Sequence, residues 1–287
     1  MKGRAIAHGA ISILNAISTG KGAALGISLQ TEVKVELLSN SKEIEVEIRN
    51  DPYEKDTLVK HAVREVLHRY SANNYGAEVV VNSNIPIGKG LKSSSAVSNA
   101  VVLAACKALG EKIDDFEAVN LGVAASLKAG VSVTGAFDDA CASYFGGIFV
   151  TDNLSKKVLK SEQAPNELHV VLYVPEGKSY TKDVDKVRLD SFRFIVEEAF
   201  NIAIRGDYWK ALTINGLIHA AALGYPVEPI VDAISAGALA AGLSGKGPAV
   251  SAVCKGDKVP GIVESWSRLD GQLIQARVNN GRAEVMA

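Results

Sequence analysis

The stretch PIGKGLKSSSA, residues 86–96, combines glycine, lysine and serine as expected of a phosphate-binding loop. Glycine lets the backbone turn through positive φ and approach a ligand closely, so that successive N–H groups can converge on phosphate oxygens. The serines stand at the start of an alanine-rich segment, where free helix N–H groups and the helix dipole favour an anion. The predicted phosphate site consists of Pro86, Gly88, Lys89, Gly90, Leu91, Lys92, Ser93, Ser94, Ser95 and Ala96.

The tripeptide Gly-Lys-Gly occurs three times, at residues 20–22, 88–90 and 245–247. One such loop alone is more simply explained as a surface turn. Three in one chain, one of which opens directly into a helix, favour anion binding. Two other phosphate motifs are excluded, because Leu91 stands where a Walker A loop needs glycine and no G-x-G-x-x-G opens a helix after the first strand.

A pair of adjacent carboxylates, Asp138 and Asp139, lies in the segment TGAFDDACASYFGG. One of them could orient a hydroxyl nucleophile, and the simpler alternative is a helix cap beside a glycine turn. Because two neighbouring carboxylates repel each other, we expect a cation close to them.

The elements that must position these residues alternate between strands and helices. Period-two alternation predicts a hairpin of strands 31–38 and 43–50, joined by the turn-prone SNSK. Helical spacing predicts a helix over 56–70, then a strand over 77–83 that enters the phosphate loop. The remaining elements of this half are a helix after the serines and a second helix from Asp114, a plausible N-cap, to Lys128.

The second half continues in the same mixed pattern. A polar turn at 152–157 leads into the next hairpin arm. Strands are predicted at 167–176, 248–254 and 272–278, and helices at 190–205, 207–223, 228–236 and 259–269. This order indicates an α+β fold, and we divide it into two domains, residues 1–150 and 151–287.

Composition excludes several classes of function. The 287 residues include 31 Lys and Arg against 32 Asp and Glu, so no basic surface for nucleic acid or anionic lipid is expected. No apolar run approaches the length of a membrane span. Cys106, Cys141 and Cys254 are widely spaced in apolar surroundings and are predicted to be buried thiols, which fits a cytoplasmic location.

Four segments, in this order, resemble the motifs of the GHMP kinases, the family of galactokinase, homoserine kinase and mevalonate kinase. They are AHGAISILNAISTGKGAALGI, the central loop read as Pro-x-x-x-Gly-Leu-x-Ser-Ser, TGAFDDACASYFGG, and GLSGKGPAVSAV. Within the family they are most similar to the archaeal type of shikimate kinase. The resemblance covers nearly the whole chain and implies a two-domain fold with the active-site cleft between the domains.

The resemblance also implies an activity, namely transfer of the ATP γ-phosphate to the 3-hydroxyl of shikimate with Mg²⁺. A homodimer is a separate expectation. Ser94 is the implied metal ligand, and Asp139, or alternatively Asp138, is the acid that orients the nucleophile. The candidates for contact with shikimate are Asn15, Lys21, Thr181, Gly245 and Gly247.

The sequence departs from the family pattern at two positions. Ala10 follows Gly9 where many members carry a lysine, and Lys92 replaces the second glycine of the central loop. Two alternatives stay open: a homoserine kinase or another GHMP small-molecule kinase, and a non-catalytic ligand sensor on the same fold.

Overall fold

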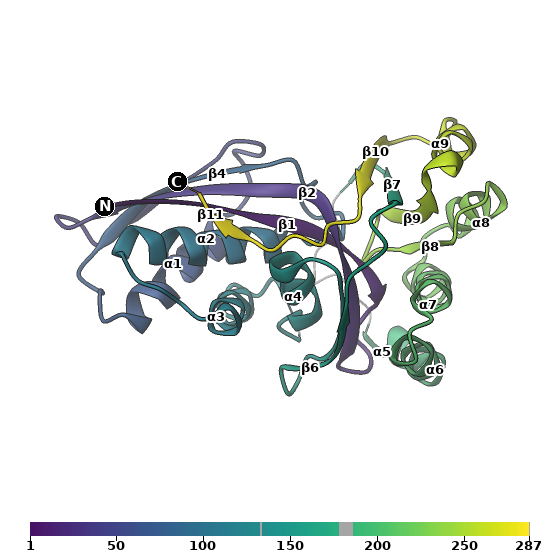
Figure 1. Ribbon diagram of the computed structural model, residues 1–287, viewed down its shortest axis with the longest axis horizontal. Coiled ribbons are helices and arrows are strands. Elements are labelled where there is room, and N and C mark those ends of the chain that lie inside the picture. The colour runs from purple at the N-terminus through teal and green to yellow at the C-terminus, as the bar shows by residue number, and fades with distance from the viewer. Residues whose placement is uncertain (133, 178–185, 287) are drawn as a thin grey trace.

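The computed structural model describes residues 1–132, 134–177 and 186–286, and these residues build two β-sheets with helices packed on them (Figure 1). The first sheet has seven strands and the second has four. No helix among the described residues is both long and apolar enough to cross a bilayer.

The first sheet is organised around one long hairpin. Its strands run in the order β11-β1-β2-β4-β3, with β5 paired to β2 and β6 paired to β5. The 18-residue β2 serves two partners, because its C-terminal part pairs with β4 and its N-terminal part with β5. The bounds are β1 Lys2–Leu14, β2 Lys21–Leu38, β3 Ile44–Ile48, β4 Gly76–Ser83, β5 Ile148–Asp152, β6 Lys157–Glu162 and β11 Glu284–Val285.

The predicted hairpin of residues 31–38 and 43–50 is wrong. Both strands form, but β4 lies between them, antiparallel to β2 and parallel to β3. The apolar side chains of β4 are mostly buried beside those of β2, whereas β3 carries two exposed glutamates, Glu45 and Glu47. A strand with charged side chains is better suited to the sheet edge, so the chain crosses over through a helix before it returns as β4.

Four helices cover one face of the first sheet (Figure 1). The central one, α2, is buried around most of its surface and packs closely on β1, where a Cβ on Gly3 would lie 2.0 Å from the carbonyl oxygen of Ala104. Asp114 caps α3 as predicted, accepting from the N–H groups of Phe116 and Glu117. The bounds are α1 Thr57–Arg69, α2 Ser93–Leu109, α3 Asp115–Lys128 and α4 Phe137–Phe145.

The second sheet has the order β10-β7-β9-β8, with all pairs antiparallel. Its strands are β7 Leu168–Val174, β8 Ala240–Leu243, β9 Val250–Lys255 and β10 Gln272–Arg277. Its helices are α5 Lys186–Asp190, α6 Arg193–Ile204, α7 Tyr208–Leu223, α8 Glu228–Ser235 and α9 Val259–Trp266.

The two sheets share a hydrophobic core. Ile11 and Leu25 of the first sheet belong to the same buried cluster as Leu172 of β7 and Leu212 of α7. The domain boundary at residue 150 stays a prediction. β5 spans that position, and the strands β6 and β11, which follow it in the chain, both belong to the first sheet. All three cysteines are buried free thiols, as predicted.

Candidate active site

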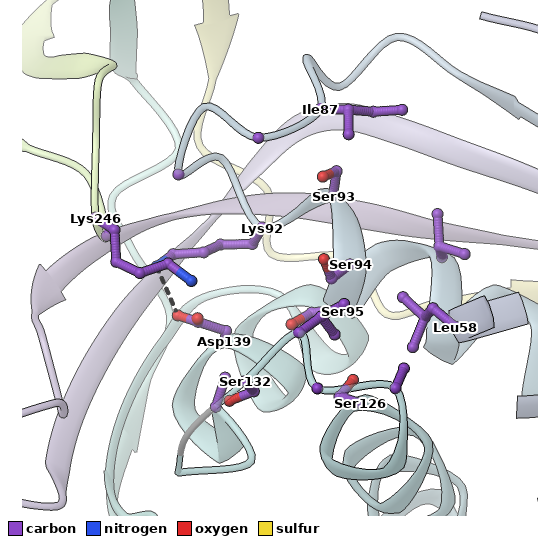
Figure 2. A pocket seen from close by; sticks show the side chains of 18 of the residues that line it. Leu58, Ile87, Lys92, Ser93, Ser94, Ser95, Ser126, Ser132, Asp139 and Lys246 are labelled. Atoms are coloured by element: carbon purple, nitrogen blue, oxygen red, sulfur yellow. Dashed lines mark ion pairs between the residues drawn. The ribbon is translucent and has the colours of Figure 1, made fainter. Parts of the chain in front are cut away.

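A cavity of about 590 Å³ lies where the phosphate loop, the start of α1 and the first turn of α4 meet. Figure 2 shows serines of the α2 N-terminus, Asp139 and Lys92 on its polar side and Leu58 and Ile87 on its apolar side. The predicted residues that line it are Asn15, Gly88, Gly90, Lys92, Ser93, Ser94, Ser95, Asp138, Asp139 and Gly245.

The phosphate loop has the backbone conformation that its composition predicts. Gly88 and Gly90 have φ values of 68° and 80°, and α2 begins at Ser93. A Cβ on Gly90 would lie 2.0 Å from the carbonyl oxygen of Ser244, so only glycine lets this loop pack against the third glycine loop. The Ser244 hydroxyl donates to the Gly90 carbonyl at 2.8 Å and holds the two loops together.

Lys92 is the cation expected beside the acidic pair. Its Nζ lies 3.1 Å from Oδ1 of Asp139 and donates to Oγ of Ser12 at 2.7 Å. The same Ser12 oxygen accepts from the N–H of Gly245 at 3.1 Å. Strand β1, the phosphate loop, the third glycine loop and α4 therefore meet around one ammonium group.

Asp138, the preceding residue on α4, is bound by different partners. Its Oδ1 accepts from Nδ2 of Asn153 at 2.7 Å, while its own N–H donates to Oδ1 of Asn153. Its other oxygen lies against Gly22, where a Cβ would be 2.2 Å away. Burial, and secondly the neighbouring Asp139 carboxylate, raise the pKa of Asp138 to about 7, against the opposing effects of Lys92 and Asn153.

Asn15 connects the β1–β2 turn to the third glycine loop. Its Nδ2 donates to the carbonyl oxygen of Gly245 at 2.8 Å, and its Oδ1 accepts from the N–H of Ile17. Its backbone N–H donates to Oδ1 of Asn215 on α7. Both polar groups of the Asn15 side chain therefore bond to the backbone of the protein. These bonds fix the position of the side chain before any ligand binds.

Several predicted site residues do not line the cavity. Lys21 extends over the Phe200 ring of α6, and Lys89 donates to the carbonyl oxygen of Pro175. Gly247 turns beside Tyr225. Thr181 lies outside the described residues. Pro86, Leu91 and Ala96 shape the phosphate loop and α2 without facing the cavity.

Several polar residues of the site were not predicted from the sequence, among them Ser12 and Asn153, which line the cavity, and Asn215, which accepts from the N–H of Asn15. Ser12 lies in the first motif, but nothing in its spacing distinguishes it from the apolar strand around it. Asn153 follows β5 in a segment that reads as a simple turn, and Asn215 carries no signal of its own. Lys246 also lines the cavity; its place in the third Gly-Lys-Gly favours anion binding, but it was not among the predicted site residues. The apolar side of the cavity was also missed, and it includes Ile48, Tyr53, Leu58, Val59 and Ile87.

The described residues contain no group of three or more His, Cys, Asp or Glu side chains arranged to hold a metal ion. A magnesium ion needs few protein ligands when it is bound with phosphates, because substrate oxygens and water complete its octahedron. The half-buried hydroxyl of Ser94 faces the cavity next to the helix N-terminus (Figure 2), which fits this mode of binding.

The comparisons with known proteins agree with this geometry. A family model described as GHMP kinases N terminal domain matches residues 57–147. The shikimate kinase of Methanothrix thermoacetophila is 45% identical over 285 residues, which cover 99% of this chain and 96% of the relative. The shikimate kinase of Pyrococcus furiosus is also 45% identical, over 96% of this chain and 98% of its own length.

The fold is similar to solved structures of the same superfamily. Mevalonate kinase of Methanococcus jannaschii matches with a TM-score of 0.78 at 14% identity, covering 96% of this chain and 98% of that chain. The predicted α+β GHMP kinase fold is thereby confirmed. The chain belongs to the GHMP kinases, which are ATP-dependent small-molecule kinases, and within them to the shikimate kinase family.

Proposed function

We propose that this protein transfers the γ-phosphate of ATP to the 3-hydroxyl of shikimate, forming shikimate 3-phosphate. The observation that carries the proposal is the cavity in which the N-terminus of α2 and the Asp139 carboxylate face the same space. The whole-length similarity to shikimate kinases supports the choice of acceptor. A phosphate bound at the helix N-terminus would then lie beside the Asp139 carboxylate, which can take the proton of the shikimate hydroxyl.

The two sides of the cavity suit the two ends of a nucleotide. Backbone N–H groups between Gly88 and Ser94, together with the positive end of the α2 dipole, would bind the β- and γ-phosphates. The apolar side, with Leu58 and Ile87, would take the purine base, because most of the binding surface for such a ring is apolar. Within residues 86–96, the proposal therefore assigns phosphate binding to Gly88, Gly90 and the serines that line the cavity.

Magnesium fits the polar side of the cavity next to Ser94. When bound, the ion neutralises charge on the phosphates. The chain's own contribution is the Ser94 hydroxyl, held at the first turn of α2 with its backbone fixed by the helix. No further metal ligand from the chain is part of the proposal.

Of the two carboxylates, Asp139 is proposed to act on the acceptor. The shikimate hydroxyl oxygen forms the new bond to the γ-phosphorus, the bond from that phosphorus to the ADP oxygen breaks with its electron pair leaving on ADP, and the hydroxyl proton passes to Asp139. Asp138 is already bound by Asn153 and pressed against Gly22, so it holds the first turn of α4 in place.

The acceptor would approach between Asp139 and the third glycine loop, near Asn15 and Gly245. Contacts of shikimate with Lys21, Thr181 and Gly247 stay predictions, as do the homodimer and the cytoplasmic location.

A coupled assay of ADP release with shikimate, homoserine and mevalonate tests the proposed function. Turnover should require ATP, Mg²⁺ and shikimate, and the product should carry one phosphate ester by ³¹P NMR. Turnover of homoserine without turnover of shikimate would establish the alternative kinase. Binding of ATP without turnover of any acceptor would establish the ligand sensor.

A further inference from the structure

Lys92 and Asp139 form an enclosed ion pair in the cavity. The Lys92 side chain is 9% exposed and that of its partner Asp139 is 14% exposed. The Lys210–Asp207 pair on the surface has corresponding values of 74% and 43%. Taking the two charges of an ion pair out of water costs free energy, and their mutual attraction restores only part of that cost. Such a pair is therefore weak evidence for stability and points to another role.

The backbone at Lys92 is also held in an unfavourable conformation. Its φ of 63° lies in the left-handed region, which is unfavourable for a non-glycine residue, and Lys92 is the N-cap of α2 without a side-chain capping hydrogen bond. This conformation is found at the point where the chain turns from the phosphate loop into the helix. Backbone strain of this kind persists where the surrounding structure enforces it, and it is found most often at functional sites.

The contacts of the ammonium group direct it toward Asp139. Nζ lies 3.1 Å from the carboxylate and 2.7 Å from Oγ of Ser12, and Ser12 is in turn bound by the N–H of Gly245. A Cβ on Gly245 would lie 2.9 Å from Nζ, so the third glycine loop closes over the ammonium. Three separate elements therefore fix this group in one place, as Figure 2 shows for the pair itself.

We infer that Lys92 is a positioning residue for phosphoryl transfer, which holds the Asp139 carboxylate facing the acceptor hydroxyl, and that it is not primarily an anchor for the nucleotide. The inference rests on the proposed function. Lys92 then has a different task from the neighbouring loop glycines. The N–H groups of those glycines bind phosphate, whereas Lys92 positions Asp139. Loss of Lys92 should then affect the transfer step more than the binding of ATP.

The variant Lys92→Met tests this, with Lys210→Met as the matched control because it also removes one lysine from an ion pair. We expect kcat of Lys92→Met to fall about 10²-fold or more, in the range for loss of general base catalysis, with KM for ATP changed by less than about threefold. Lys210→Met should leave both constants unchanged. A raised KM for ATP with kcat retained would show a nucleotide anchor and overturn the inference.

A double-mutant cycle keeps the test valid if Lys92→Met folds poorly, since that change leaves Asp139 enclosed without its cation. The variant Lys92→Met with Asp139→Asn removes both charges and should unfold at a higher temperature than Lys92→Met alone. Its kcat should equal that of Asp139→Asn, because a positioning residue acts through its partner. An equal fold-loss from Lys92→Met with and without Asp139 would overturn the inference.

The variant Lys92→Arg keeps the charge and should retain more of kcat than Lys92→Met. A kcat as low as that of Lys92→Met in a folded Lys92→Arg would show that shape alone matters and would contradict the inference. If the unaltered protein does not phosphorylate shikimate, the proposed function falls, and this inference with it. Turnover of shikimate with an unchanged kcat in Lys92→Met overturns the inference alone.

Discussion

Asp138 and Asp139 are consecutive residues on the first turn of α4 and both line the cavity, yet each contacts a different part of the molecule. Asp138 is 3% exposed and faces the first glycine loop and the β5–β6 turn, where Gly22 and Asn153 enclose it. Asp139 faces the phosphate loop, with Lys92 as its partner. The two aspartates therefore have different contacts, because successive residues of a helix point about 100° apart and so meet different neighbours.

The comparison teaches that a perturbed pKa does not by itself identify the reacting group. Asp138 has the strongly raised pKa, but its oxygens are committed to contacts within the protein. Asp139 instead pairs with Lys92, the N-cap residue of α2. The position of a group relative to the bound phosphates decides its role, before its pKa does.

The largest expected effect is the difference between Asp139→Asn and Asp138→Asn. Asp139→Asn should lower kcat about 10² to 10⁴-fold, because the acceptor hydroxyl loses its proton acceptor. Asp138→Asn should lower kcat less and change the melting temperature more. Steady-state assays and thermal unfolding of both variants measure this. Near-normal kcat in both would remove Asp139 from the mechanism, and a larger loss in Asp138→Asn would reverse the two roles.

The pH dependence of stability should separate the two carboxylates next. The folded protein holds a proton on Asp138 up to about pH 7, whereas the unfolded chain releases it near the ordinary value of 3.8. The contribution of Asp138 to stability is therefore fully present below about pH 4 and is lost as pH rises to 7, by on the order of a few kcal/mol.

Asp138→Asn removes this titration, so its free energy of unfolding should rise relative to that of the unaltered protein between pH 4 and 7. Urea unfolding of the two proteins at several pH values in this range measures the difference. A difference that is constant with pH would show that Asp138 is ionised in the folded protein throughout.

Gly22→Ala should disturb the Asp138 region directly. The new Cβ would lie 2.2 Å from the Asp138 carboxylate oxygen and 2.6 Å from its carbon, so the first turn of α4 must shift. We expect a loss of about 2 to 3 kcal/mol in the free energy of unfolding, near the upper end for an overpacked core. Gly261→Ala is the control, since its nearest neighbour would be 3.6 Å away. Equal stability of the two variants in urea would contradict this account.

Asn153→Ala should have the smallest of these effects. It removes the donor to Asp138 Oδ1 and the acceptor of the Asp138 N–H, and also the acceptor of the Thr151 hydroxyl. The unfolding free energy should fall by about 1 to 2 kcal/mol, because water can enter the space and partly satisfy these groups. The exposed Asn166 supplies the control as Asn166→Ala. A shift of that control as large as the shift of Asn153→Ala would argue against a specific role for Asn153.

Much of the site could be predicted from local sequence. Gly88, Gly90 and the serines predict a phosphate-binding loop, because positive φ and a helix N-terminus depend on residues that are adjacent in the chain. Ser12 and Asn153 could not be found in this way, since their roles arise from contacts with residues 80 and 15 positions away in the sequence. The same reason explains the wrong hairpin, because the pairing of β2 depends on β4, which follows after a helix.

The amino-acid sequence by itself determined the α+β character, the phosphate loop at the start of α2 and the acidic pair, because period, turn chemistry and capping act over a few residues. Only the tertiary structure decided that Lys92 pairs with Asp139, that Gly22 presses on Asp138 and that Lys21 and Lys89 extend away from the cavity. These contacts depend on which loops the two sheets bring together around their shared core. Contacts between loops that are distant in the sequence leave no periodic pattern in the chain.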